Sequence, residues 1–255
     1  MLACAHRELD LEALGGMSVF REWNRDQMEQ DINFIGLIVF KNQLKDDTTE
    51  NIAELKRGAT RTTMITGDTA LTGVYIARQC GMVETGAKVL LGDYKSKEER
   101  VVWSDVDNET AFPDVNVDDY LNEQERVPVE LAVTGKAFNW LVDHDLIRKY
   151  LLDIRVFARM TPNGKVQCIQ LHMERGITAM TGDGGNDCGA LRAAHVGIAM
   201  SDAEASIVSP FSTSIRSVKS CVELIRQGRG ALATSLTGYK YLISKCMMIS
   251  CIIIY

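Results

Sequence analysis

The sequence predicts an open α/β fold, in which helices cover both faces of a mostly parallel β-sheet. Short β-rich segments are apolar at nearly every position, which is typical of strands buried on both faces. Helical patterns alternate with these segments along the chain, as they do in βαβ units. In open sheets of this kind, ligands bind at the carboxyl ends of the strands, so the residues that follow each strand are the first candidates for a functional site.

Five segments are predicted to be buried parallel strands because they are short, β-rich and apolar. They comprise residues 34–40, 62–65, 154–158, 177–180 and 196–200. The helical patterns that alternate with them cover residues 48–56, 70–79, 165–174 and 186–194. Residues 84–128 differ, since they are rich in Asp, Glu, Asn and Lys and have weak periodicity. We expect this stretch to be a solvated acidic insertion.

Composition excludes several classes of protein. With 46% hydrophobic and 24% charged residues, the chain has the balance of an ordinary globular protein. The formal net charge is -6, and no basic stripe indicates a nucleic-acid partner. None of the seven cysteines shows C-x-x-C spacing, so reduced thiols are expected rather than a zinc site or a disulfide framework.

The C-terminal stretch from Tyr239 to Tyr255 is mostly apolar. A helix that spans a membrane needs about 20 apolar residues. Only the run after Lys245 is free of charge, and it is shorter than that. The residues alone leave two interpretations open, a membrane helix and a buried core helix.

The strongest motif is MTGDGGND, over residues 180–187. A strand ends at Asp183, two glycines turn the chain, and Asn186 and Asp187 open a helix. The glycines permit positive φ and a close approach of the backbone. Two carboxylates at a strand's carboxyl edge, beside the positive end of a helix, suit Mg²⁺ with a phosphate next to it. The alternative is a simple acidic turn, but the whole octet between a strand and a helix favours a functional site.

A second motif, MITGD over residues 64–68, also ends an apolar strand before a helix. The Thr66 hydroxyl and the Gly67 amide are suited to donate hydrogen bonds to phosphate oxygens. A plain helix cap by Asp68 or Thr69 is the alternative, and both interpretations can hold at once.

A third motif, FARMTPNGK over residues 157–165, places Pro162 in the first turn of a helix and Lys165 one turn in. A lysine there can neutralise a phosphoryl group as a point charge. Taken alone, Lys165 is better explained as a solvated helix lysine. The presence of two other motifs at strand ends favours a role for Lys165 in the site.

Together these strand ends resemble those of the haloacid dehalogenase superfamily of phosphoryl-transfer domains. LKDDT at 44–48 precedes the three motifs, and the four segments follow the order of the P-type ATPase phosphorylation domain. NDCGAL at 186–191, AEASIVSPF at 203–211 and GRGALATS at 228–235 look like the type-5, subgroup B members. Gly185 departs from the pattern, because the family usually has Ala or Thr at this position.

The resemblance implies roles for the residues that match its motifs. Asp183 is expected to ligate Mg²⁺, and Asp187 to be the second carboxylate, which places the metal or Lys165. Asn186, Thr66 and Lys165 are expected to contact the phosphoryl group.

The resemblance also implies contacts with ATP. Gly67 and Asp68 are expected to line the nucleotide phosphates, and Arg159 to contact the ribose.

The resemblance divides the chain into three parts. Residues 1–33 would be the tail of a nucleotide-binding domain, 34–230 the C-terminal part of the phosphorylation domain, and 231–255 the start of a transmembrane helix. The family's nucleophile lies in an Asp-Lys-Thr-Gly-Thr motif on the central strand, and no such motif occurs in this sequence. We therefore expect a fragment that lacks the central strand and has no ATPase activity alone.

The function implied is a part of an ATP-driven membrane transporter of cations, in this subgroup polyamines, in endolysosomal or vacuolar membranes. The domain would face the cytosol, and its partners would be ATP, the transported cation, the remainder of the transporter and, through the C-terminal helix, the membrane. Two alternatives remain. A free-standing phosphatase of the same superfamily would need its own Asp nucleophile early in the chain, and a non-catalytic remnant would only bind Mg²⁺ or nucleotide.

Overall fold

The computed structural model describes residues 1–10, 16–40, 43–108, 114–122, 128–200 and 204–254. The chain separates into two compact units, Met1–Gln43 and Leu44–Tyr255. The strands and helices that carry all three motifs belong to the second unit.

The first unit contains a two-stranded sheet, in which β1 (Leu2–His6) pairs antiparallel with β2 (Asn33–Ile38). Two short helices, α1 (Met17–Arg21) and α2 (Arg25–Met28), lie between these strands in the sequence.

The prediction of a buried parallel strand over residues 34–40 is wrong in two respects. β2 runs antiparallel to β1, and its apolar side chains, including Phe34, Ile35 and Leu37, are exposed. An apolar run predicts burial, but burial also needs a covering layer. In the described part of this unit no layer buries the side chains of either sheet face.

The second unit contains a five-stranded sheet with the order β3-β7-β6-β4-β5. The first four strands pair in parallel, and β5 lies at the edge, antiparallel to β4. The strands are β3 (Met64–Ile65), β4 (Lys88–Lys95), β5 (Arg100–Asp105), β6 (Val129–Thr134) and β7 (Ile154–Ala158). The prediction for β7 is confirmed over the same residues, and every position of this strand is buried.

A three-stranded sheet in the same unit has the order β10-β9-β8, and both of its pairs are parallel. Its strands are β8 (Ala179–Gly182), β9 (Val196–Ala199) and β10 (Phe211–Ser212). β3 and β8 are each the last strand of their sheet, so each has one unpaired edge in the described part of the chain. Ile65 of β3 packs against the cluster around Phe157 and also against the cluster around Met180, so apolar contacts join the two sheets there.

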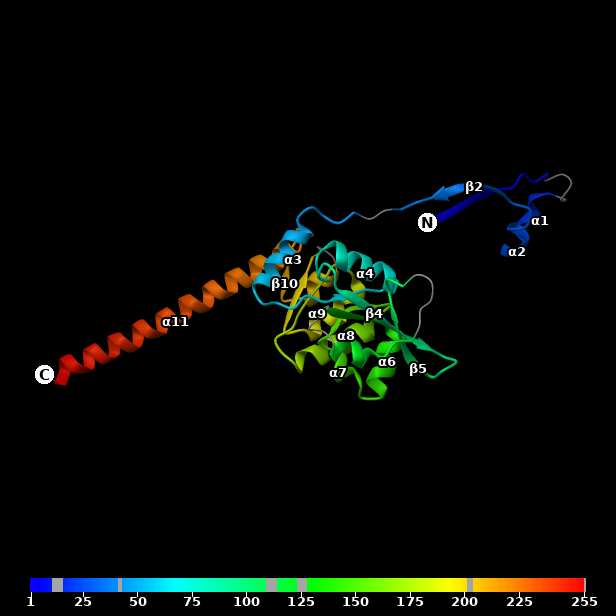
Figure 1. The fold of residues 1–255 in the computed structure, drawn as a ribbon. Helices are drawn as coiled ribbons and strands as arrows, with labels where there is room; N and C mark the ends of the chain where they lie inside the picture. Colours follow the sequence, from blue (N-terminus) through cyan, green and yellow to red (C-terminus); the bar gives the residue numbers. More distant parts are fainter. Residues whose placement is uncertain (11–15, 41–42, 109–113, 123–127, 201–203, 255) are drawn as a thin grey trace. The chain divides into compact units, whose positions relative to one another are not determined.

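Helices cover both faces of the five-stranded sheet, as predicted (Figure 1). On one face lie α6 (Gly135–Asp143), α7 (Ile147–Tyr150) and α8 (Pro162–Met173). On the other face lies α4 (Ala70–Gln79), which agrees with its predicted range. Apart from the C-terminal helix, the other helices in the described residues of the domain are α3 (Thr48–Arg57), α5 (Val117–Asn122), α9 (Cys188–Ala193), α10 (Glu204–Val208) and the 3₁₀ turn Gly185–Asp187.

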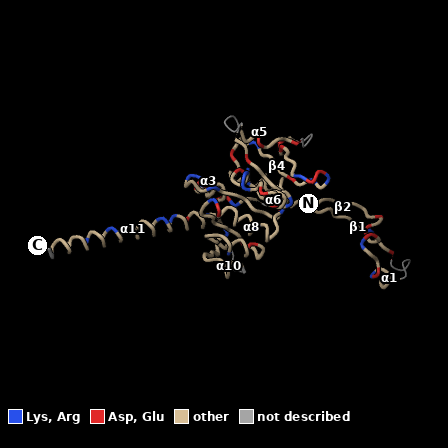
Figure 2. Tube along the Cα trace, turned by 90° about the horizontal axis from the view of Figure 1, so that it is seen from below, with Lys and Arg blue, Asp and Glu red and all other residues tan. Residues whose placement is uncertain are grey.

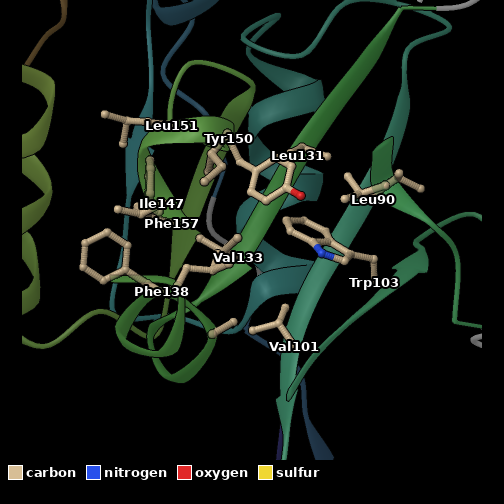
Figure 3. Packing of buried hydrophobic residues seen from close by; sticks show 14 of the residues in the cluster. Leu90, Val101, Trp103, Leu131, Val133, Phe138, Ile147, Tyr150, Leu151 and Phe157 are labelled. Carbon is tan, nitrogen blue, oxygen red and sulfur yellow. The ribbon is translucent and has the colours of Figure 1, made fainter. Parts of the chain in front are cut away.

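The larger buried cluster is built around aromatic rings (Figure 3). The ring centroids of Phe138 and Phe157 are 5.8 Å apart, and those of Trp103 and Tyr150 are 5.7 Å apart, both in edge-on arrangements. Pairs of this kind stabilise a core by about 0.5–1.5 kcal/mol beyond the burial of their area. They fix α6 and α7 against the sheet.

The prediction of a solvated insertion over residues 84–128 is wrong for most of its described residues. β4 and β5 lie within it, and Leu90, Val101 and Trp103 are buried in the main cluster. The charged residues of this stretch lower its average hydropathy and so conceal two short strands. The prediction also omits β6, which is buried at all positions.

A buried ion pair joins the central strands. Arg155 of β7 donates two hydrogen bonds to the Glu130 carboxylate of β6, at 2.9 and 2.6 Å, and a third to the Thr62 carbonyl, at 2.7 Å. Removal of one partner from such a pair costs about 3–5 kcal/mol, since a buried charge is left uncompensated. The pair therefore fixes β6, β7 and the segment before β3 to one another.

In the described part of the chain, the C-terminal helix α11 (Lys219–Ile254) has its contacts with the rest of the domain near its start. Val222 is buried against Ile52 and Leu55 of α3, and Arg226 pairs with Glu54. Most of the described side chains that follow are exposed, and the helix carries five basic residues and a single acidic one (Figure 2).

No helix in the described residues has the length and apolar character that a membrane crossing requires. The transmembrane start predicted for residues 231–255 is therefore not supported. Lys240 and Lys245 interrupt the apolar stretch of this helix.

The distal part of α11 should make the chain self-associate, because Ile243, Met247 and Ile249 are exposed. A chain that ends at Gly238 should stay monomeric at concentrations at which the full chain forms oligomers. Sedimentation velocity in detergent-free buffer measures this. The shortened chain should keep its unfolding midpoint, because the Val222 anchor is retained, and equal association of both chains would contradict the prediction.

Candidate functional site

The sheet brings two of the predicted motifs together at the carboxyl ends of β3 and β7. Thr66 follows β3, and its amide donates to the Phe157 carbonyl at 2.8 Å. Beyond β7, the Arg159 amide donates to the Asp68 carbonyl at 2.9 Å, and the Met160 amide donates to the Thr66 carbonyl at 3.0 Å. Because these bonds join backbone to backbone, the two loops have a fixed relative position.

The third strand end contributes through an ion pair. Lys165 Nζ lies 2.7 Å from Asp187 Oδ1, and the two side chains are only 12% and 14% exposed. Thr161 caps the start of α8, since its hydroxyl accepts from the Gly164 amide, and Pro162 lies in the first turn as predicted. This start places Lys165 within reach of the loop after β8, so the pairing that was one of two predicted roles of Asp187 is present.

A glycine permits this arrangement for one of the two predicted reasons, a close approach to the backbone. A Cβ added to Gly182 would lie 2.6 Å from Asp187 Oδ2. Residue 182 must therefore lack a side chain, because the Asp187 carboxylate lies against the end of β8. Gly184 has an ordinary φ of -107°, and no positive φ is found at the glycines of this loop. Close approach, and not a left-handed turn, is what the motif requires.

Asp183 and Asn186 lie exposed in the same loop as Asp187. Carboxylate and amide oxygens fit a hard cation such as Mg²⁺. No group of three or more His, Cys, Asp or Glu side chains in the described residues is arranged to hold a metal. The oxygen atoms of this loop are thus of the type that binds Mg²⁺, but they are too few for a complete site. Lys165 already neutralises the Asp187 carboxylate.

The Thr66–Asp68 loop is shaped by a local hydrogen bond. Thr66 Oγ1 accepts from the Asp68 amide at 3.0 Å, which leaves the hydroxyl hydrogen of Thr66 available to a ligand. α4 is capped by Thr69, whose Oγ1 accepts from the Thr72 amide, so Asp68 is not the cap. Gly67 and Asp68 are exposed, as a loop that meets a ligand must be.

One residue beside the site was not predicted. Cys221, near the start of α11, places its Sγ 3.2 Å from Thr181 Oγ1, and burial raises the pKa of its thiol. Only long-range packing creates this contact, and nothing in the local sequence around residue 221 indicates it.

An α/β sheet whose strand ends supply a Thr-Gly-Asp loop, a lysine and a paired carboxylate is compatible with the class of haloacid-dehalogenase-like domains. No family model matches the chain. Curated proteins do match it along nearly its whole length.

Human polyamine-transporting ATPase 13A3 is 36% identical over 260 residues, which cover 95% of this chain and 21% of that protein. Mouse probable cation-transporting ATPase 13A4 is 36% identical over 232 residues, covering 86% and 19%. Human polyamine-transporting ATPase 13A2 is 36% identical over 258 residues, covering 96% and 22%. The chain is thus a homologue of the type 13A P-type ATPases, in agreement with the type-5 resemblance, and it spans about a fifth of their length.

Magnesium should bind only weakly to this chain, in the millimolar range or above, because few protein oxygens are available and Mg²⁺ then keeps its waters. Asp187→Asn should change the affinity little, since Lys165 already occupies this carboxylate. Asp183→Asn should abolish what binding there is. Isothermal calorimetry with MgCl₂ measures all three, and micromolar binding by the unaltered chain would refute the expectation.

Proposed function

We propose that the chain is part of an ATP-driven membrane transporter of the P-type ATPase kind, which couples an aspartyl-phosphate to the translocation of a cation or polyamine. The observation that carries the proposal is the Lys165–Asp187 pair at the sheet edge that also bears the Thr66–Asp68 loop. The relatives of 36% identity support the same assignment.

In this proposal, residues 34–230 are the C-terminal part of the phosphorylation domain and residues 1–33 are the tail of the nucleotide-binding domain. The domain faces the cytosol, and the whole protein resides in an endolysosomal or vacuolar membrane. Polyamine or another cation is the cargo by analogy with the names of the relatives.

The chain's own residues have distinct tasks in phosphoryl transfer, which depends mainly on positioning and charge neutralisation. Lys165 neutralises the charge of the phosphoryl group, and Asp187 holds the lysine at the sheet edge. The Thr66 hydroxyl and Asn186 contact phosphoryl oxygens. Asp183 would hold Mg²⁺, which supplies further neutralisation of phosphate charge when bound.

Three further residues are assigned to ATP. Gly67 and Asp68 line the nucleotide phosphates, and Arg159 contacts the ribose.

The nucleophilic aspartate comes, in this proposal, from a strand outside these 255 residues. The sequence contains no Asp-Lys-Thr-Gly-Thr motif. β3 and β8 each pair in parallel with their one neighbouring strand, and the contacts of Ile65 join their two sheets, which supports a site for one further strand between them.

The isolated chain should form no phosphoenzyme, because covalent catalysis requires the missing carboxylate. The purified chain is incubated with γ-labelled ATP and Mg²⁺, and the acid-precipitated protein is counted. A full-length relative serves as the positive control. An acid-stable, hydroxylamine-sensitive phosphoprotein would contradict the prediction, and phosphatase activity towards a small phosphate ester would favour a free-standing phosphatase.

A peptide that contains the apolar strand and Asp-Lys-Thr-Gly-Thr should raise the melting temperature of the chain. Unpaired N–H and C=O groups at β3 and β8 would gain partners, and the stabilisation should grow with peptide concentration by mass action. A peptide of the same length, with proline substituted in the strand, is the control, since it cannot pair. A high melting temperature that neither peptide changes would show that no strand is missing.

A further inference from the structure

β6 passes directly into α6 at Thr134 and Gly135, and this strand-to-helix junction, called the Thr134–Gly135 turn below, lies at the same sheet edge as the Thr66 and Arg159 loops. None of the predicted motifs includes it. β6 pairs in parallel with β7, and the register aligns Thr134 with Ala158, so the Thr134–Gly135 turn is next to the turn that carries Arg159.

Gly135 is in unusually close contact with that neighbouring turn. A Cβ added at this position would lie 2.4 Å from the Arg159 carbonyl oxygen and 3.2 Å from the Arg159 carbonyl carbon. Both are backbone atoms, so no side-chain rotation can relieve the overlap. Any larger residue at 135 must therefore displace the Arg159–Met160 peptide.

The Arg159–Met160 peptide begins at a residue with an unfavourable backbone conformation. Arg159 has a φ of +51°, in the left-handed region that is unfavourable for residues with a side chain. Its amide and that of Met160 donate the two hydrogen bonds that hold Asp68 and Thr66, at 2.9 and 3.0 Å. The position of the Thr66–Asp68 loop thus depends on an unfavourable turn that Gly135 contacts from the other side.

The hydrogen bonds of Thr134 fix the position of Gly135. Its hydroxyl donates to Asp93 Oδ1 of β4 at 2.7 Å and accepts from the Ala137 amide at 3.3 Å, where it caps α6. The hydroxyl is therefore engaged both as donor and as acceptor. A series of contacts runs from β4 through the Thr134–Gly135 turn to Arg159 and on to the Thr66–Asp68 loop.

We propose that Gly135 is a positioning residue of the nucleotide site. Held by Thr134 and Asp93, it leaves room for the left-handed Arg159 turn and so keeps Arg159, Thr66 and Asp68 in one arrangement. The inference rests on the proposed function in taking the ligand to be ATP.

The test compares Gly135→Ala in the full chain with Gly176→Ala. Gly176 is exposed and a Cβ there would meet nothing within 4 Å, so the control makes the same chemical change in open space. In Gly135→Ala, the Arg159 and Met160 amides should exchange with solvent about tenfold faster by NMR, because their hydrogen bonds are lost. Amides within β6 and β7 should keep their protection. Unchanged exchange at Arg159 and Met160 would overturn the proposal.

If Gly135→Ala does not fold, a second pair of variants, at Thr134, tests the same series of contacts. Thr134→Val removes the hydroxyl without adding bulk at residue 135, and it should also speed exchange at Arg159 and Met160. Thr134→Ser keeps the hydroxyl and should restore slow exchange. Equal exchange in the Val and Ser variants would count against the proposed series of contacts.

Binding of Mg·ATP separates the inference from the proposed function. Gly135→Ala should weaken binding several-fold relative to Gly176→Ala, measured at a temperature well below the melting temperature of either variant. Equal affinity of the two variants, despite faster exchange in the first, would overturn the positioning role. If the unaltered chain binds no ATP, the assignment of ATP contacts to this chain fails, and the exchange measurements still decide whether Gly135 holds the loops.

Discussion

The parallel pairing of β7 with β6 on one side and β3 on the other is the constraint on which the domain depends. β7 is buried at all positions, so its backbone groups have no access to water and must bond to neighbouring strands. Phe157 enters the cluster beneath α6 and α8, while Val156 and Ala158 enter the cluster beneath α4. The pair of Arg155 with Glu130 adds a polar link between the same strands. With β7 fixed in this way, the loops after β3, β6 and β7 meet at one edge.

Charge compensation governs the chemistry at that edge. Lys165 and Asp187 have little exposure to solvent, and each would be costly to bury without the other. An additional anionic group, such as the phosphoryl group of our proposal, would share the lysine with Asp187. Asp183 and Asn186 remain exposed and supply oxygen atoms without such a partner in the ion-pair network described. The site therefore offers one neutralising cation and a partial set of ligands.

In the described residues, β3 and β8 each end their own sheet with one unpaired edge. Free edges present backbone donors and acceptors to other chains and favour strand addition or association. Ile65 of β3 packs against the apolar clusters of both sheets, so the two sheets share apolar contacts next to the β3 edge. The homology extends over 95% of the chain but only 21% of the relative 13A3.

Local patterns in the sequence determined the elements of the α/β layers. β7 and α4 occur over the predicted residues, because an all-apolar run and a capped helical pattern are local signals. The three motifs at the strand ends were recognisable for the same reason, and parallel pairing made their convergence predictable. Tertiary structure alone decided the rest. β4 and β5 were concealed in an acidic stretch, and β2 is apolar yet exposed, since burial depends on what packs against a strand. The contacts of Gly182 with Asp187, Gly135 with Arg159 and Cys221 with Thr181 join residues that are separate in the sequence, so no local periodicity records them.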